Sequence, residues 1–180
     1  MRFKSFFQAS LRIDHCLLVL FFACCVGCDS SSETSAVASS PAASPAQTPR
    51  ALLTLSRANG FAGVVDVANT KISSSPQGLV VQALTTDPAI ALPRMAVTGQ
   101  TPLKVRIQFV SPGPTMLQLF YDTKAHPDHW VESQSIRKPT AQGENNITVE
   151  IPDPGFGGRI RLDPGDLTGE YLIMRIEVVP

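Results

Sequence analysis

The sequence predicts an all-β fold for the part of the chain after residue 50, in the form of an antiparallel two-sheet β-sandwich. Apolar and polar residues alternate there with a period of two, turns rich in Pro and Gly separate the alternating runs, and no run of ten or more residues carries a helical stripe. Such alternation is typical of antiparallel strands that face a core on one side and water on the other. Roughly nine or ten short strands favour a sandwich, with a closed barrel as the alternative.

The chain begins with a segment that is typical of a secretory signal peptide. Residues 1–14 are polar and carry three basic side chains, and the twelve residues 16–27 form an apolar run. A helix of that length rises about 18 Å, which is less than the roughly 30 Å of a bilayer core. We therefore expect residues 1–27 to be a signal peptide, with an uncleaved membrane anchor as the alternative.

All four cysteines of the chain lie within the first 28 residues, and Cys28 is the last of them. The segment Cys25-Val26-Gly27-Cys28 resembles the lipobox of bacterial lipoproteins, which are cut before the final cysteine and acylated on it. The resemblance implies that acylated Cys28 anchors the protein to a lipid bilayer in the bacterial cell envelope, facing the periplasm in a Gram-negative organism. Asp29 follows, and in enterobacterial lipoproteins an aspartate at this position favours the inner membrane. Ordinary cleavage near an unmodified Cys28 and a Cys-x-x-Cys redox or metal motif are the other interpretations.

Residues 28–50 are expected to form a disordered tether. After Cys28 the stretch consists largely of Ser, Ala, Thr and Pro. Such a composition buries too little apolar surface to offset the entropy of ordering. A flexible coil of this length spans about 25–30 Å, which is enough to separate a folded domain from the lipid head groups.

Residues 51–180 are expected to form one domain, because their length suits a single core. They contain 11 Lys and Arg residues and 12 Asp and Glu residues. Because the charge is balanced and no basic stripe is present, nucleic acid is excluded as a partner.

Three runs show the alternation most clearly, namely residues 103–109, 147–151 and 172–178. In the last run the residues expected on the buried face are Leu172, Met174, Ile176 and Val178, opposite Arg175 and Glu177. The remaining candidate strands are residues 52–55, 61–67, 78–84, 95–98, 115–121, 130–136 and 158–162. Turn motifs such as Asn59-Gly60 and Asp153-Pro154-Gly155 separate them.

Residues 78–179 resemble jelly-roll β-sandwich modules. The motifs that carry the resemblance are Gly78 with Asp87-Pro88, Arg161-Leu162-Asp163-Pro164, Gly169 and Ile173-Met174-Arg175-Ile176. They are similar to galactose-binding-like and carbohydrate-binding modules that occur beside bacterial glycosyltransferases. The resemblance implies a jelly-roll fold and a glycan ligand. Asp163 is expected to be structural and to cap its turn, with a bound Ca²⁺ as the smaller alternative.

The candidate ligand-binding residues are Trp130, Tyr121, Arg137 and Arg106, with Phe156, Tyr171 and Arg159 as further members of the set. Aromatic rings stack on the apolar faces of sugars, and guanidinium groups donate hydrogen bonds to hydroxyl or carboxylate oxygens. The alternative for each ring is a place in the core. Because Phe120 and Tyr121 point to opposite faces of a strand, only one of them is expected to be buried.

The segment His126-Pro127-Asp128-His129 holds nitrogen and oxygen donors that metals use. His126, Asp128 and His129 are weak candidates for metal ligands, and an ordinary solvated loop is the favoured interpretation. No catalytic residue and no cofactor are expected, because the sequence has no nucleophile elbow, zinc-protease motif or phosphate loop.

The leading hypothesis is therefore a membrane-tethered, noncatalytic β-sandwich lipoprotein that binds a glycan or an envelope protein. A structural or assembly lipoprotein that recruits partners through an exposed sheet edge is the second hypothesis. The third is a polysaccharide hydrolase, with Glu132, Glu144 and Asp122 as its candidate carboxylates.

Overall fold

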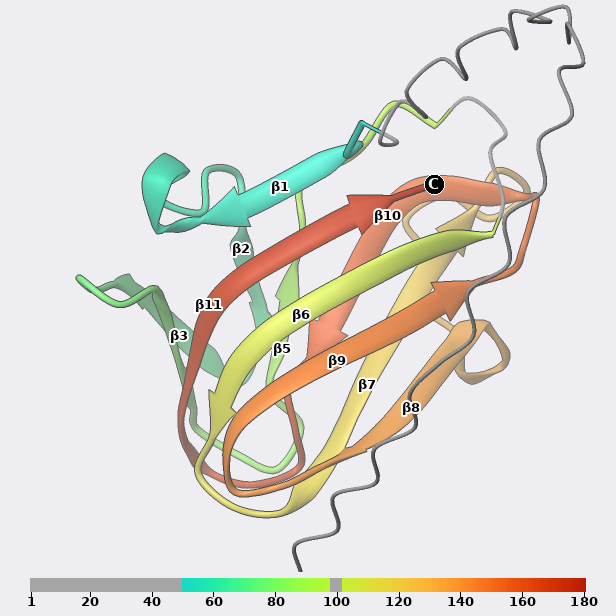
Figure 1. Ribbon diagram of the computed structural model, residues 1–180. Helices are drawn as coiled ribbons and strands as arrows, with labels where there is room; N and C mark the ends of the chain where they lie inside the picture. Colours follow the sequence, from blue (N-terminus) through green and yellow to red (C-terminus); the bar gives the residue numbers. More distant parts are fainter. Residues whose placement is uncertain (1–49, 98–101) are drawn as a thin grey trace, which may run out of the picture. The chain divides into compact units, whose positions relative to one another are not determined.

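The computed structural model (Figure 1) describes residues 50–97 and 102–180. The expected signal peptide, Cys28, Asp29 and nearly all of the expected tether lie outside these residues. The described part of the chain contains eleven strands and two short 3₁₀ helices, and neither of these helices is long and apolar enough to cross a membrane.

The strands are β1 (Leu53–Ser56), β2 (Val65–Ala68), β3 (Thr70–Ser74), β4 (Leu79–Ala83), β5 (Ala89–Ala91), β6 (Leu103–Ser111), β7 (Thr115–Thr123), β8 (Ser135–Thr140), β9 (Gly143–Ile151), β10 (Phe156–Asp163) and β11 (Gly169–Val179). The 3₁₀ helices are η1 (Arg57–Asn59) and η2 (Glu132–Gln134).

The strands form two antiparallel sheets, which confirms the predicted sandwich and makes the closed-barrel alternative wrong. The six-stranded sheet has the order β3-β4-β11-β6-β9, with β1 also paired to β11, and the five-stranded sheet has the order β2-β5-β10-β7-β8. β4 pairs with the first half of β11 and β1 with the second half, so these two short strands follow one another along the same edge of β11. In Figure 1 the sheets lie face to face, with β11, β6 and β9 in front of β10, β7 and β8.

The core lies between the sheets and is built by the alternation. On β6, Leu103, Val105 and Phe109 are fully buried, whereas Lys104 and Arg106 point outward and are exposed. The largest fully buried side chains are Tyr171, Phe109, Phe156, Leu55, Ile90, Leu92, Leu103, Leu117, Leu119, Ile151, Ile160 and Leu162. Each buried apolar side chain of this size contributes about 1.5–3 kcal/mol, and both sheets supply them.

β11 contains a break in its alternation. The register against β6 shifts between Ile173 and Arg175, so that Met174 is the extra residue of a β-bulge. The residues of β11 that face the core are Tyr171, Ile173, Ile176 and Val178. The prediction that Leu172 and Met174 share the buried face with Ile176 is wrong, because the bulge reverses the two faces of the strand. Leu172 lies before the bulge, Met174 lies within it, and both are only half-buried.

Other strand predictions need correction as well. The expected strand 61–67 begins only at Val65, because Phe61 has a φ of 54° and lies in a turn. The expected strand 130–136 is largely a loop followed by η2, and β8 starts at Ser135. Residues 95–97 form no strand. β3 and β5 were not predicted, because β3 is mostly polar and the three residues of β5 are all buried, so neither alternates clearly.

Candidate functional site

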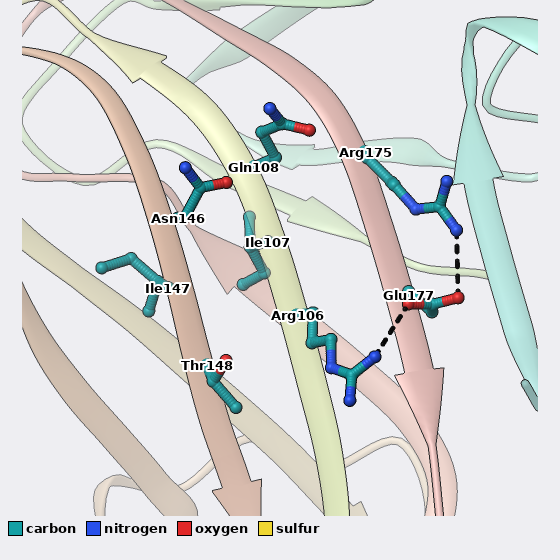
Figure 2. A pocket seen from close by; sticks show the side chains of 8 residues that line it. All are labelled: Arg106, Ile107, Gln108, Asn146, Ile147, Thr148, Arg175 and Glu177. Carbon is teal, nitrogen blue, oxygen red and sulfur yellow. Dashed lines mark hydrogen bonds and ion pairs between the residues drawn. The ribbon is translucent and has the colours of Figure 1, made fainter. Parts of the chain in front are cut away.

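A pocket of about 240 Å³ lies on the outer face of the six-stranded sheet, over β6, β9 and β11. Its lining residues are Arg106, Ile107, Gln108, Asn146, Ile147, Thr148, Arg175 and Glu177 (Figure 2). The six polar residues carry outward-facing side chains, whereas Ile107 and Ile147 belong to the inward-facing set. Among these lining residues none is aromatic.

Strand parity explains why the polar side chains of β6 and β9 meet here. Arg106 and Gln108 lie on the outer face of β6, and Asn146 and Thr148 are exposed on β9. In the antiparallel register Arg106 lies opposite Thr148, and Gln108 lies opposite Asn146. Directly opposed side chains in antiparallel strands are about 4.5–5.5 Å apart at Cβ, so the four groups form two adjacent rows.

The bulge in β11 brings two further residues into these rows. Before Met174 the odd-numbered residues Tyr171 and Ile173 face the core, whereas Arg175 after it faces outward and is exposed. Arg175 therefore lies opposite Gln108, and Glu177 lies opposite Arg106. Without the extra residue both charged side chains would point into the core, where unpaired charges are strongly unfavourable.

A shared carboxylate holds the two arginines of the pocket. Arg106 Nη1 lies 3.4 Å from Glu177 Oε2, and Arg175 Nη2 lies 3.0 Å from Glu177 Oε1. Figure 2 shows both guanidinium groups turned toward this carboxylate from either side. The Glu177 side chain is 19 % exposed, whereas those of Arg106 and Arg175 are 57 % and 51 % exposed. The arginines are thus oriented by the protein and still reachable from solvent.

The pocket is equipped for hydrogen bonding. Each guanidinium carries five N–H donors, and Glu177 engages one nitrogen of each. The amides of Gln108 and Asn146 and the hydroxyl of Thr148 both donate and accept. Such a set can bind hydroxyl groups and carboxylates on a polar ligand.

Of the four sequence-predicted ligand residues, Arg106 alone lines this pocket. Arg137 lies on β8 in the five-stranded sheet, where its guanidinium is 2.7 Å from Glu132. Trp130 is half-buried in the loop between β7 and η2. The structure therefore places these residues at separate positions and does not bring them into one site.

Tyr121 is 8 % exposed and faces the core, where its ring packs edge-on against Phe156 with 6.4 Å between ring centroids. Burial raises the pKa of the Tyr121 hydroxyl. Its position does not fit a sugar-stacking role. Phe120 is also 8 % exposed, although it points outward, because the guanidinium of Arg161 covers its ring at 4.9 Å. The expectation that only one of the two rings is buried is therefore wrong.

Tyr171, another aromatic candidate, is fully buried as well. Its hydroxyl donates to the Leu167 carbonyl at 3.0 Å and accepts from the Leu167 amide at 3.1 Å. This side chain anchors the loop before β11 and does not reach the outer surface.

Asp128 binds arginines in the loop that follows β7. Its carboxylate lies 2.7 Å from Arg94 and 2.6 Å from Arg159, and the hydrogen bond from Arg159 is the main cause that lowers the pKa of Asp128. His126 and His129 are exposed in the same loop. Among residues 50–97 and 102–180, no group of three or more His, Cys, Asp or Glu residues is arranged to hold a metal ion.

The three candidate carboxylates of a hydrolase do not share a site. Asp122 is fully buried on the five-stranded sheet, Glu132 is paired with Arg137, and Glu144 lies exposed on β9 of the other sheet. A glycosidase needs two carboxylates that flank one bond. This placement gives the hydrolase hypothesis no support.

Asp163 is the last residue of β10 and has a structural role that differs from the expected turn cap. Its two carboxylate oxygens accept from Nε and Nη2 of Arg161, both at 2.8 Å. Burial is the largest influence and raises the pKa of Asp163, although the guanidinium acts in the opposite direction. The buried pair fixes the guanidinium over Phe120.

Sequence reasoning missed five of the six polar residues of the pocket, which are Gln108, Asn146, Thr148, Arg175 and Glu177. The signal in the sequence was their outward position in alternating strands. Only the pairing of β6 with both β9 and β11 shows that these outward faces are neighbours.

No protein-family model and no curated protein matches the sequence. The chain is similar to a solved structure of the CBM22-1 and GH10 modules of the Clostridium thermocellum endo-1,4-beta-D-xylanase 10B, which is complexed with xylohexaose. The two chains are 10 % identical and align with a TM-score of 0.56. The alignment covers 73 % of this chain and 28 % of that chain. It is also similar to a variant of the family 29 carbohydrate-binding module CBM29-2 complexed with cellulohexaose, with 13 % identity and a TM-score of 0.51 over 73 % of this chain and 89 % of that chain. At these identities the likeness concerns the β-sandwich fold alone.

Proposed function

We propose that the domain is a noncatalytic glycan-binding domain and that the pocket over β6, β9 and β11 is its binding site. The observation that carries the proposal is the lining, in which donors and acceptors from three neighbouring strands meet in about 240 Å³. Sugar hydroxyls both donate and accept hydrogen bonds, as Gln108, Asn146 and Thr148 do. The fold shared with structures that contain carbohydrate-binding modules supports the proposal.

Recognition in this pocket would rest on hydrogen bonds rather than on ring stacking, since none of its lining residues is aromatic. Strand pairing fixes the backbone of the lining residues, and Glu177 holds the side chains of Arg106 and Arg175 in place before a ligand arrives. Such preorganisation lowers the entropy lost on binding.

The charged groups of the pocket favour binding over hydrolysis. Its one carboxylate, Glu177, contacts two guanidinium groups. Retaining and inverting glycosidases use two carboxylates on opposite sides of the scissile bond. We therefore propose a binding domain without hydrolase activity.

A glycan array with the full-length protein would identify the preferred polysaccharide, and variants would then locate the site. The double variant Gln108→Ala/Asn146→Ala is expected to weaken affinity for that polysaccharide about 10–100-fold, because two hydrogen bonds of about 0.5–1.5 kcal/mol each are lost. Affinity electrophoresis or isothermal titration calorimetry measures the change.

The matched control is Gln82→Ala. Gln82 lies on β4 of the same sheet, is half-buried on its outer side and does not line the pocket. It is expected to leave affinity unchanged. Equal binding by the double variant and the wild type would place the site elsewhere, and no binding on the array would remove the proposed function.

We further propose that acylated Cys28 tethers this domain to a membrane of the bacterial cell envelope. The support lies in the sequence, where a lipobox-like segment follows an apolar run and precedes the Ser-, Ala- and Pro-rich stretch. Several acyl chains on one residue hold a protein firmly to a bilayer, because each buried methylene contributes about 0.8 kcal/mol.

The variant Cys28→Ser is expected to move the protein from the membrane fraction to the soluble fraction, and the mass of the wild-type protein should include its acyl chains. Cell fractionation and intact-mass spectrometry measure these outcomes. Cys16→Ser, which removes another thiol of the same segment, is the control and should fractionate like the wild type. A Cys28→Ser protein that stays in the membrane fraction would contradict the tether.

A further inference from the structure

We infer that the glycan bound in this pocket carries a carboxylate, as in a uronic acid, and that Arg106 and Arg175 bind that group. The inference rests on the proposed function and names the class of sugar that the same site takes. It starts from the charge of the lining, in which two arginines stand against a single glutamate. The pocket therefore has an excess of positive charge.

The two guanidinium groups are arranged to share one anion. Arg106 lies opposite Glu177, and Arg175 lies two residues before Glu177 on the same strand, so the arginines are diagonal neighbours. Diagonal positions in antiparallel strands are about 7–8 Å apart, within reach of long side chains. Both guanidinium groups already turn to one carboxylate, that of Glu177.

Solvent exposure distinguishes the arginines from their internal partner. Their side chains are more than half exposed, whereas that of Glu177 is 19 % exposed. Glu177 therefore lies lower in the pocket and leaves outward N–H donors for a ligand. Guanidinium groups bind carboxylates with paired, charge-assisted hydrogen bonds, which are stronger than those to neutral hydroxyls.

The surroundings of the pocket limit how much negative charge a ligand can carry. Glu144 and Glu150 are exposed on the same outward face of β9, on either side of Asn146 and Thr148. Lys104 lies opposite Glu150, whereas Glu144 lies opposite the apolar Val110. A ligand with a charge on every sugar would approach Glu144, so an oligosaccharide with isolated carboxylates fits best.

Matched pairs of tetrasaccharides test the inference on the full-length protein. Each pair consists of a tetrasaccharide with one glucuronate, galacturonate or mannuronate residue and of its carboxyl-reduced counterpart, in which –COO⁻ becomes –CH₂OH. We expect at least one uronate form to bind about tenfold or more tightly than its reduced form in isothermal titration calorimetry. Raising the salt concentration should narrow that difference.

Single variants then assign the carboxylate to the arginines. Arg106→Gln and Arg175→Gln are each expected to weaken binding of the uronate form about tenfold and to change binding of the reduced form much less. Lys104→Gln is the matched control, because Lys104 is an exposed cation on β6 that does not line the pocket. It should retain nearly the wild-type preference.

The variant Glu177→Gln tests whether affinity for the uronate form rises or falls when the internal carboxylate is removed. It keeps the size of the side chain and removes the carboxylate that competes with the ligand for both guanidinium groups. Affinity for the uronate form is expected to rise about threefold or more. If Glu177 instead accepts hydroxyl groups of a neutral sugar, the same variant should bind more weakly.

Any one of four outcomes would overturn the carboxylate assignment. They are equal binding of the reduced and uronate forms, an unchanged wild-type preference in the Arg106→Gln and Arg175→Gln variants, weaker binding by Glu177→Gln, and binding of neutral glycans on the array while all three uronates fail. In each of these cases the glycan-binding proposal stands. Failure of every charged and neutral glycan would remove both proposals together.

Discussion

Replacing Asp122 with alanine is expected to lower the free energy of unfolding by about 3–5 kcal/mol. The carboxylate is fully buried. Its Oδ1 accepts from the backbone amide of Arg159 at 2.8 Å, its Oδ2 accepts from the amide of Asp128 at 3.1 Å, and Arg94 lies 3.4 Å away. In the alanine variant the backbone amides of Arg159 and Asp128 would lose their acceptor, and the guanidinium of Arg94 would lose one of its ion-pair partners.

Urea denaturation of the full-length protein measures this loss. Asp122→Asn is expected to lose less than the alanine variant, because its amide oxygen still accepts one of the two hydrogen bonds. Asp66→Ala is the control, since Asp66 is exposed on β2, and its effect should stay within about 0.5 kcal/mol. An unfolding midpoint of Asp122→Ala equal to that of Asp66→Ala would show that the buried carboxylate contributes no net stability.

Replacing Gly158 with alanine is also expected to destabilise the fold by about 3–5 kcal/mol, for a steric reason. Gly158 lies in β10 with a φ of +100°, a conformation that L residues rarely adopt. A Cβ atom there would lie 2.3 Å from the carbonyl oxygen of Met95 and 3.1 Å from a methyl group of Val97. The segment that crosses at this point is itself bound to β10, because the Met95 amide donates to the Gly158 carbonyl at 2.8 Å.

The variant Gly143→Ala separates the backbone strain from the steric overlap, which both contribute at Gly158. Gly143 has a similar φ of +87°, but a Cβ atom there would meet nothing within 4 Å. This variant should therefore show the backbone strain alone, about 1–2 kcal/mol. Thermal or urea unfolding of both variants measures the difference, and equal losses at the two positions would contradict the proposed overlap with Met95.

The sequence predicted the β-sandwich because alternation is a property of each strand taken alone. On β6 and β9 the parity of a residue decides whether it faces the core or the solvent. The same alternation correctly predicted that Arg175 and Glu177 lie on the outward face of β11. The same rule failed for Leu172, because one extra residue at Met174 reverses the two faces of β11.

Burial of individual rings could not be predicted from parity. Phe120 points outward and is nevertheless buried, because Arg161 from a strand far along the chain covers it. Arg161 is held there by Asp163, which lies two residues further on β10. An outward ring on β7 is buried only if a neighbouring strand places a side chain over it. Which strand pairs with β7 cannot be read from the alternation of residues within β7.

By itself the sequence determined the period-two strands, the inward and outward faces of most of them, and the nearly balanced charge of residues 51–180. Only the tertiary structure decided that the outward faces of β6, β9 and β11 adjoin, and that Arg106, Arg175 and Glu177 therefore share one pocket. The physical reason is that alternation is local to a strand. A pocket on a sheet requires hydrogen-bonded pairing between strands that are distant in the chain, in a register that a single bulge can change.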